Sequence, residues 1–408
     1  MRIRRSRIAL ALCATVLSAL PPSRLSAQGT RILRQPSVSA TQIAFAYAGD
    51  IWIAGRDGGD ARRITSAPGM EENPRLSPDG RYLAYSGEYS GNWDVYVVAL
   101  GEGTPVRLTW HPGVDDVRGW TPDGRSVVFA TNRQNPRKDG VQLWTVPRGG
   151  GYEQPLPLPE ANHAMFSPDG RRVVYERVRQ WDLEWRNYRG GQNQPIQIFD
   201  LADSSVQKLP WAGSKEIEPV WLGNAIYFIS DRDWAGNIWR CDLASGNLEQ
   251  VTHYKDYDVK TLAAGGGVLV YEQAGYLHLL DPATREDRQL VINLRGELPW
   301  AQPRWVDAAK DAASASLSPT GARALIEARG EVFTVPAEKG DVRNLTRSPG
   351  AADHAPVWSP DGKKVAWFSD ASGEYRLLIG SQDALESPRE IVLEHPTYYY
   401  DPAWSPDG

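Results

Sequence analysis

The chain has 408 residues, of which 41% are hydrophobic and 23% charged, and its formal net charge at pH 7 is −5. This composition excludes an intrinsically disordered chain, because it carries enough apolar surface for a packed core, and the length suits two or three domains. A negatively charged surface repels phosphate backbones, so we expect no nucleic-acid partner. Sixteen Trp, seventeen Tyr, 38 Gly and 30 Pro favour many short β-strands joined by tight turns.

The first 27 residues have the pattern of a secretory signal peptide. A group of four arginines precedes the apolar run at residues 8–20, and Leu-Ser-Ala at residues 25–27 forms a small-residue cleavage site. The run is short for a transmembrane span, although an uncleaved anchor is the alternative. Cleavage removes five Arg and no acidic residue, which takes the net charge from −5 to −10. It leaves Cys241 as the single thiol, so no internal disulfide is predicted.

A four-residue turn signature, Ser-Pro-Asp-Gly, repeats along the chain. Ser suits the first position of a type I turn, Pro presets φ at the second, and Gly takes the left-handed position that closes a hairpin. Two strand-like runs follow each copy, and each unit ends in a stretch of the type Arg-x-Leu-Thr. The copies, some with one residue changed, begin at Ser77, Thr121, Ser167, Ser318, Ser359 and Ser405.

Units of four strands in about 40–45 residues are typical of β-propeller blades. The terminal stretches count six blades over residues 31–292, although the turn signature is degenerate between residues 171 and 317. Residues 293–311 lack the pattern and are predicted to connect two rings. The predicted fold is therefore all-β: a six-bladed propeller, then the first two to three blades of a second propeller at residues 312–408. One continuous eight-bladed ring is the alternative.

No catalytic constellation is recognisable in the sequence. It contains no Gly-x-Ser-x-Gly elbow, no His-Glu-x-x-His, no phosphate-binding Gly loop and no EF-hand loop. We therefore predict no catalytic residue, no cofactor and no metal site within residues 1–408. The scattered histidines are interpreted as loop or structural residues; they are His111, His163, His253, His278, His354 and His395.

Acidic residues gather before the innermost strands of several blades. Glu71-Glu72, Asp115-Asp116 and the segment 256–258 are interpreted as solvated loop charge, with an acidic channel rim as the alternative. Asp231 and its neighbouring Arg are expected to connect blades through charge-assisted hydrogen bonds.

An insertion in the fourth blade, residues 177–191, interleaves aromatic rings with guanidinium groups. Arg binds carboxylates in a bidentate manner, and Trp, Tyr and Arg are frequent in protein interfaces. The loop could clamp an extended peptide or its carboxylate, contact a protein, or pack on its own blade. The predicted substrate-contact residues are Arg179, Trp185, Arg186, Tyr188 and Arg189.

Residues 327–346 resemble bacterial tricorn protease homologues, as do the shorter segments 188–191, 227–232 and 256–260. The resemblance spans residues 31–408. It implies a six-bladed propeller, a seven-bladed propeller, and then a PDZ module flanked by serine-protease core domains. The catalytic residues of that family lie in its C-terminal core and have no counterpart here. The resemblance also implies propellers that form channels for unfolded peptides, and a cytosolic homohexamer.

Together these features predict the substrate-gating region of a tricorn-type serine peptidase that degrades peptides. The chain ends inside a predicted turn at Gly408, so we expect the gene product to continue into a catalytic part. The turn signature also resembles the Tol-system propeller, so a non-catalytic periplasmic binding module is the alternative, and a propeller-fused amidohydrolase a third. The signal-like segment predicts a periplasmic or secreted protein, whereas the family precedent is cytoplasmic.

Overall fold

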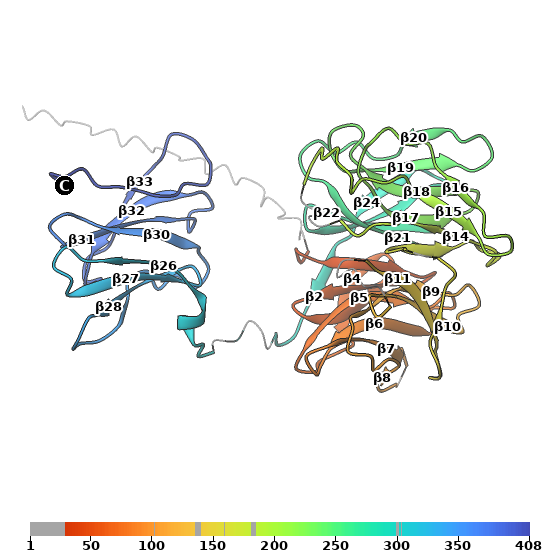
Figure 1. Ribbon diagram of the computed structural model, residues 1–408, viewed down its shortest axis with the longest axis horizontal. Helices are drawn as coiled ribbons and strands as arrows, with labels where there is room; N and C mark the ends of the chain where they lie inside the picture. The colour runs from red at the N-terminus through yellow and green to blue at the C-terminus, as the bar shows by residue number, and fades with distance from the viewer. Residues whose placement is uncertain are drawn as a thin grey trace, which may run out of the picture. The chain divides into compact units, whose positions relative to one another are not determined.

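The structure, a computed structural model, describes residues 29–101, 103–134, 140–158, 160–180, 185–298, 302 and 304–408. The predicted signal peptide and part of the predicted connector lie outside these residues. The chain divides into two compact units, residues 1–301 and 302–408. Strands dominate both units (Figure 1), which confirms the all-β class. The part of the chain that is described contains no helix long and apolar enough to cross a membrane.

The first unit contains six sheets, each built on four antiparallel strands that form one propeller blade (Figure 1). In every blade the strands pair in chain order, so each blade is a meander of neighbouring segments. Blades one to three comprise β1 (Arg34–Val38), β2 (Gln42–Tyr47), β3 (Asp50–Gly55), β4 (Gly58–Arg63), β5 (Met70–Leu76), β6 (Tyr82–Glu88), β7 (Trp93–Ala99), β8 (Val106–Arg107), β9 (Asp115–Trp120), β10 (Ser126–Thr131), β11 (Gln142–Pro147) and β12 (Gln154–Pro155). Blades four to six comprise β13 (Ala164–Phe166), β14 (Arg172–Tyr175), β15 (Gln197–Asp200), β16 (Val206–Lys208), β17 (Glu216–Leu222), β18 (Ala225–Ser230), β19 (Asn237–Asp242), β20 (Leu248–Gln250), β21 (Val259–Gly265), β22 (Val268–Gln273), β23 (Tyr276–Asp281) and β24 (Glu286–Gln289).

The ring closes between blades one and six. Phe45 and Trp52 of blade one share a buried apolar cluster with Val270 of blade six. A further strand, β25 (Ile292–Leu294), runs parallel to β4 on the outer edge of blade one. The N–H of Thr30 donates to the carbonyl of Ile292 at 2.7 Å. Both ends of the unit therefore meet on blade one, and the six sheets form a complete ring rather than part of an eight-bladed one.

The turn signature folds as its local chemistry predicts. The hydroxyl of Ser77 donates to Asp79 at 2.6 Å and accepts from the N–H of Tyr82 at 3.0 Å. Gly80 has φ of +67°, which a residue with a side chain adopts only at a cost. A Cβ added at Gly124 would lie 3.5 Å from Pro78, so the turns of successive blades also pack on one another. The signature thus serves both the hairpin and the contact between blades.

The Arg-x-Leu-Thr stretch ties the fourth strand of a blade to its third strand. The hydroxyl of Thr109 accepts from the N–H of Val95 at 3.0 Å and donates to Asp94 at 3.3 Å. Arg107 pairs with the same Asp94 at 2.6 Å. The equivalent threonine contacts are Thr65 to Ile51, Thr252 to Ile238 and Thr346 to Val332. Because these fourth strands have only a few residues, the buried hydroxyl supplies a contact that their short ladders lack.

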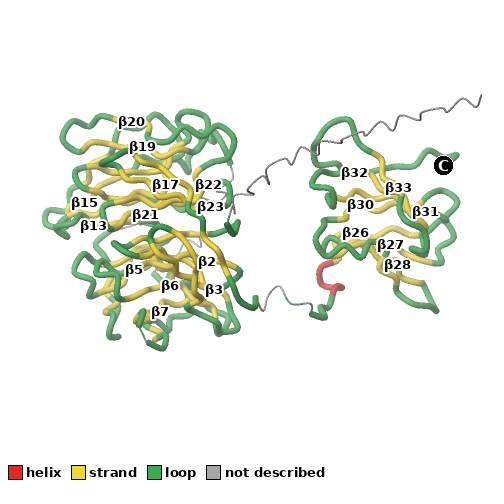
Figure 2. Tube along the Cα trace, turned by 180° about the vertical axis from the view of Figure 1, so that it is seen from behind, coloured by secondary structure: helices red, strands yellow, loops and turns green. Residues whose placement is uncertain are grey.

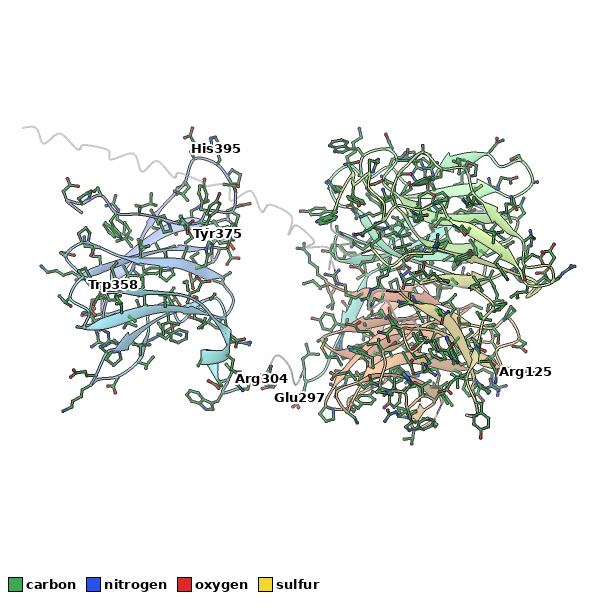
Figure 3. The ribbon with its side chains drawn as sticks, viewed as in Figure 1. Arg125, Glu297, Arg304, Trp358, Tyr375 and His395 are labelled. Carbon is green, nitrogen blue, oxygen red and sulfur yellow. The ribbon has the colours of Figure 1, made fainter. Side chains whose placement is uncertain are left out.

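The second unit contains two more four-stranded sheets (Figure 2). They are preceded by a 3-10 helix, η2 (Ala308–Asp311). After the second sheet, Tyr398 stacks on His354 with ring centroids 4.7 Å apart. Tyr375, labelled in Figure 3, meets both rings edge-on. The strands are β26 (Ala312–Leu317), β27 (Arg323–Ala328), β28 (Glu331–Pro336), β29 (Arg343–Asn344), β30 (Asp353–Trp358), β31 (Lys364–Ser369), β32 (Arg376–Ser381) and β33 (Arg389–Ile391).

Candidate functional site

The innermost strands of the first ring are interrupted by β-bulges. The register shifts in β1, β5, β9, β17 and β21. In three of these bulges a residue with positive φ precedes a proline: Gln35 (+51°), Asn73 (+54°) and Glu218 (+54°). Proline has no N–H to donate to the ladder, so pairing stops there and the polar residue before it is displaced from the regular pleat. Backbone strain of this kind is often retained at functional sites.

Around these bulges lies a ring of polar side chains, which we call the polar belt. Its ion pairs are short: Arg118 to Asp116 at 2.9 Å, and His163 to Glu218 at 2.9 Å. The amide of Asn73 donates to the same Asp116 at 2.5 Å. The belt consists of Gln35, Asn73, Arg75, Asp116, Arg118, His163, Glu176 and Glu218.

Hydrogen bonds of the polar belt join neighbouring blades. The N–H of Asn73 in blade two donates to the side-chain oxygen of Gln35 in blade one at 2.8 Å. Arg118 in blade three donates to both the carbonyl and the side-chain oxygen of Asn162, at 3.0 Å each. The N–H of Glu218 in blade five donates to Glu176 of blade four at 2.9 Å. The belt therefore cross-links five consecutive blades.

The charges in the belt depend on one another. Burial disfavours the ionised form of Asp116, but the positive charges of Arg118 and His163 outweigh burial and hold the pKa of Asp116 below its usual range. Burial likewise opposes a charge on His163, yet Glu218 and Glu176 raise the pKa of that imidazole to about 9. His163 is therefore an imidazolium at neutral pH, and its charge balances the carboxylates beside it.

Two hollows lie along the innermost strands, and they share no lining residue. The mouth hollow, of about 340 Å³, is lined by the beginnings of these strands, including Gln35 and Glu72. The turn-side hollow, of about 280 Å³, is lined by their later parts, including Arg75, Arg118 and His163. Belt residues line both hollows, and we call the belt their charged waist.

The blade-four insertion reaches two other blades beside the mouth hollow. Both oxygens of Asp258 accept from Nε of Arg186 at 3.0 Å. Arg189 donates to the two oxygens of Asp231 at 3.0 and 3.1 Å. Asp231 follows β18 of blade five, and Asp258 precedes β21 of blade six. The described part of the loop is therefore not confined to its own blade, and Asp231 connects blades as expected.

The predicted substrate-contact residues lie in different surroundings. Arg179 is exposed, and its charge acts on the carboxyl groups of Glu72 and Asp116. The rings of Trp185 and Tyr188 lie 5.5 Å apart. The guanidinium groups of Arg186 and Arg189 are already engaged by aspartates, which leaves less of their hydrogen-bonding capacity for a ligand. Substrate contact by all five residues stays a prediction. Residues 181–184 of the insertion lie outside the described residues.

The interpretation of the acidic pairs as solvated loop charge is wrong for Glu71 and Asp115. Both carboxylates are buried near the starts of β5 and β9 rather than placed in the solvated loops before these strands. Glu71 accepts from the hydroxyl of Thr65 at 3.0 Å, and burial raises its pKa to about 7. Asp115 pairs with Arg133 at 2.5 Å. Asp256, in contrast, is exposed.

His163 is a candidate site residue that the sequence analysis interpreted as a loop or structural histidine. A positional signal exists, because His163 lies four residues before the serine of a turn signature, as Asn73 does. Among the described residues, no group of three or more His, Cys, Asp or Glu could hold a metal ion.

Comparison with known proteins gives this architecture a family context. Residues 30–286 match the family model of the tricorn protease N-terminal beta propeller domain. A tricorn protease homolog 1 of Streptomyces coelicolor is 30% identical over 357 residues, covering 84% of this chain and 32% of that protein. The crystal structure of the tricorn protease covers 92% of this chain and 46% of its own, with a TM-score of 0.59 and 20% identity. A TolB homolog of Chlorobium luteolum matches only 62 residues, at 36% identity, 15% of this chain and 14% of its own. The chain thus spans about a third of the curated tricorn relative.

Proposed function

Because the chain belongs to the family of the tricorn protease N-terminal β-propeller domain, we propose that it is the substrate-gating region of a tricorn-type serine peptidase that degrades peptides. Catalysis is assigned to a part of the full-length protein outside residues 1–408. The observation that carries the proposal is the closed six-bladed ring whose inner strands line two hollows and a charged waist. The proposal joins the two hollows into one axial route, which admits an extended chain and rejects a folded domain by size.

Polar groups at the waist suit an extended peptide. A passing backbone presents N–H and C=O groups that lose their water, and these need partners inside the channel. The belt offers carboxylates, amides and guanidinium groups within a ring held rigid by contacts between blades. Such partners are independent of the peptide's sequence, which fits a peptidase that accepts many peptides.

The test uses the complete gene product and fills the channel without touching the belt. Ala264 lines the turn-side hollow, so Ala264→Trp should obstruct it. The matched control is Ala244→Trp, because Ala244 is exposed on the turn between β19 and β20. We expect Ala264→Trp to lower the cleavage rate of long unfolded peptides relative to the control. Cleavage at the control's rate, with the fold intact, would remove the gating role.

The compartment and the assembly are further parts of the proposal. We propose that residues 1–27 direct export and are removed, so mass spectrometry of the mature protein should find a chain that begins at Gln28. Retention of Met1 would favour an anchor or a cytoplasmic protein. We also propose that the complete gene product forms a homohexamer, and a measurement of its mass in solution tests this.

A further inference from the structure

The turn-side hollow is lined by the guanidinium of Arg75, whose hydrogen bonds to described residues use carbonyl oxygens. Nε of Arg75 donates to the carbonyl of Arg118 at 3.2 Å, and one terminal nitrogen donates to the carbonyl of Pro74 at 3.0 Å. Among the described residues, no carboxylate lies within ion-pair distance of Arg75, and its second terminal nitrogen has no hydrogen bond. Burial lowers the pKa of Arg75, as expected for a desolvated cation. A guanidinium nevertheless keeps its proton. The charges of Glu218 and Asp116 act on it from beyond ion-pair distance, and neither carboxylate uses its second terminal nitrogen.

A second unused donor faces the same hollow. Nδ1 of His163 lies 2.9 Å from Glu218 and 3.5 Å from Glu176, within ion-pair distance of both carboxylates but without a hydrogen bond to either. Nε2 of the same ring has no hydrogen bond to any described residue, although His163 lines the hollow. The ring is therefore ion-paired on its Nδ1 side, and its Nε2 is available to a ligand.

The carboxylates of the belt act on the charges of Arg75 and His163, but they accept no hydrogen bond from the two donors that remain. Asp116 accepts from Asn73 and Ser86 and pairs with Arg118. Glu218 is held by His163. The remaining donors are therefore available to a ligand rather than to the protein.

The rest of the hollow is mainly apolar. Its lining includes Pro78, Met165, Val220 and Leu262. A small apolar hollow with a few convergent polar groups is typical of a ligand site. The planar fork of a guanidinium matches the two oxygens of a carboxylate.

From these contacts we infer that the turn-side hollow is a carboxylate-binding site, in which Arg75 and His163 hold the carboxylate and Arg118 adds positive charge beside it. This site deepens the proposed function and rests on it for the identity of the ligand, a peptide. The carboxylate can come from the C-terminus of the peptide or from an acidic side chain.

The experiment measures binding to the 408-residue chain by calorimetry, without any proteolysis assay. The probes are acetyl-Ala-Ala with a free carboxylate, its C-terminal amide, and acetyl-Ala-Glu amide. We expect both acids to bind, and the neutral amide to bind at least about tenfold more weakly. If only the first acid binds, the site takes peptide termini; if only the glutamyl amide binds, it takes acidic side chains.

Variants separate the site from a general charge effect. Arg75→Gln should weaken acid binding by roughly tenfold to a hundredfold, because it removes a charge-assisted bidentate contact. Arg81→Gln, at an exposed position after the turn, is the matched control and should bind as the wild type does. If Arg75→Gln fails to fold, Arg75→Lys keeps the charge without the fork and should bind with intermediate affinity.

A pH series examines the role of His163. The groups around it are Arg75, Arg118, Asp116, Glu176 and Glu218, and the imidazolium is the group among them expected to lose its charge near pH 9. Acid binding should therefore weaken as the pH rises through about 9, and His163→Gln should abolish that dependence.

Three results would overturn the inference. They are equal binding of acid and amide, wild-type binding by a folded Arg75→Gln variant, and tighter binding of sulfate than of either peptide acid. Loss of gating in the peptidase assay with carboxylate binding intact would instead count against the proposed function alone.

Discussion

The two units of the chain use the same bulge with different side chains. In the first unit, Glu218 has positive φ before a proline, and its N–H is accepted by Glu176. In the second unit, Ala355 occupies the equivalent position with φ of +52°, and its N–H is accepted by Glu327 at 2.9 Å. The positive-φ residue before a proline, and the carboxylate that accepts its N–H, are therefore features that blades of both units share. Of the three bulge residues before prolines in the first ring, Glu218 carries an ionisable side chain, whereas Ala355 carries none. We therefore expect the charged belt to be a feature of the first ring rather than of every blade.

The largest expected effect distinguishes a buried ion pair from an exposed one. Arg118→Ala leaves Asp116 without its main partner and removes two contacts to Asn162, so we expect a loss of about 3 kcal/mol in the stability of the first unit. Urea denaturation of the full chain measures this loss. Arg329→Ala, which removes an exposed pair with Asp311 in the second unit, is the control and should cost less than about 1 kcal/mol. Equal costs for the two variants would contradict the distinction.

The hydrogen bonds of the threonine in the Arg-x-Leu-Thr stretch should contribute similarly to the stability of both units, because blades of both units contain them. Thr109→Val and Thr346→Val each leave a strand N–H and a carboxylate without the hydroxyl. We expect each to destabilise its own unit by about 1–3 kcal/mol in thermal unfolding. A loss confined to one unit would show that the tie is not a general feature of these blades.

The pH dependence should separate the units as well. The folded pKa of His163 is raised to about 9 from an ordinary value of 6.5. Its contribution to the stability of the first unit is therefore complete below about pH 6.5 and is lost as the pH rises through about 9. NMR titration of His163 tests this directly, and Glu218→Gln should lower the measured pKa. Burial lowers the pKa of His354 in the second unit, so its NMR signal should titrate at a pH below the ordinary pKa of histidine.

The smallest expected effect concerns Glu71. Its folded pKa is raised to about 7, so the stability linked to its protonated form is lost between about pH 4.5 and 7. We expect Glu71→Gln to match or exceed the stability of the wild type at pH 8, although Glu71 is buried in the first ring. A marked loss of stability at that pH would mean that the carboxylate is needed in its ionised form.

Much of the fold was predictable from the sequence because its key contacts are local. The turn hydrogen bonds of Ser77 join residues two and five positions apart, so the local sequence is enough to predict the geometry of the turn. The candidate site was less accessible to prediction. Arg186 and Arg189 are attractive ligand contacts in the sequence, yet their partners Asp258 and Asp231 lie 72 and 42 residues away.

The sequence by itself determined the hairpin turns, the repeating blade and the number of sheets in the first ring, since each depends on residues close together in the chain. Tertiary structure alone decided which polar residues meet at the axis. Asn73 meets Asp116 across 43 residues, and His163 meets Glu218 from the next blade, because closing the ring brings the innermost strands together. The charge of His163 and the unpaired guanidinium of Arg75 arise from burial and neighbours that only the closed ring creates.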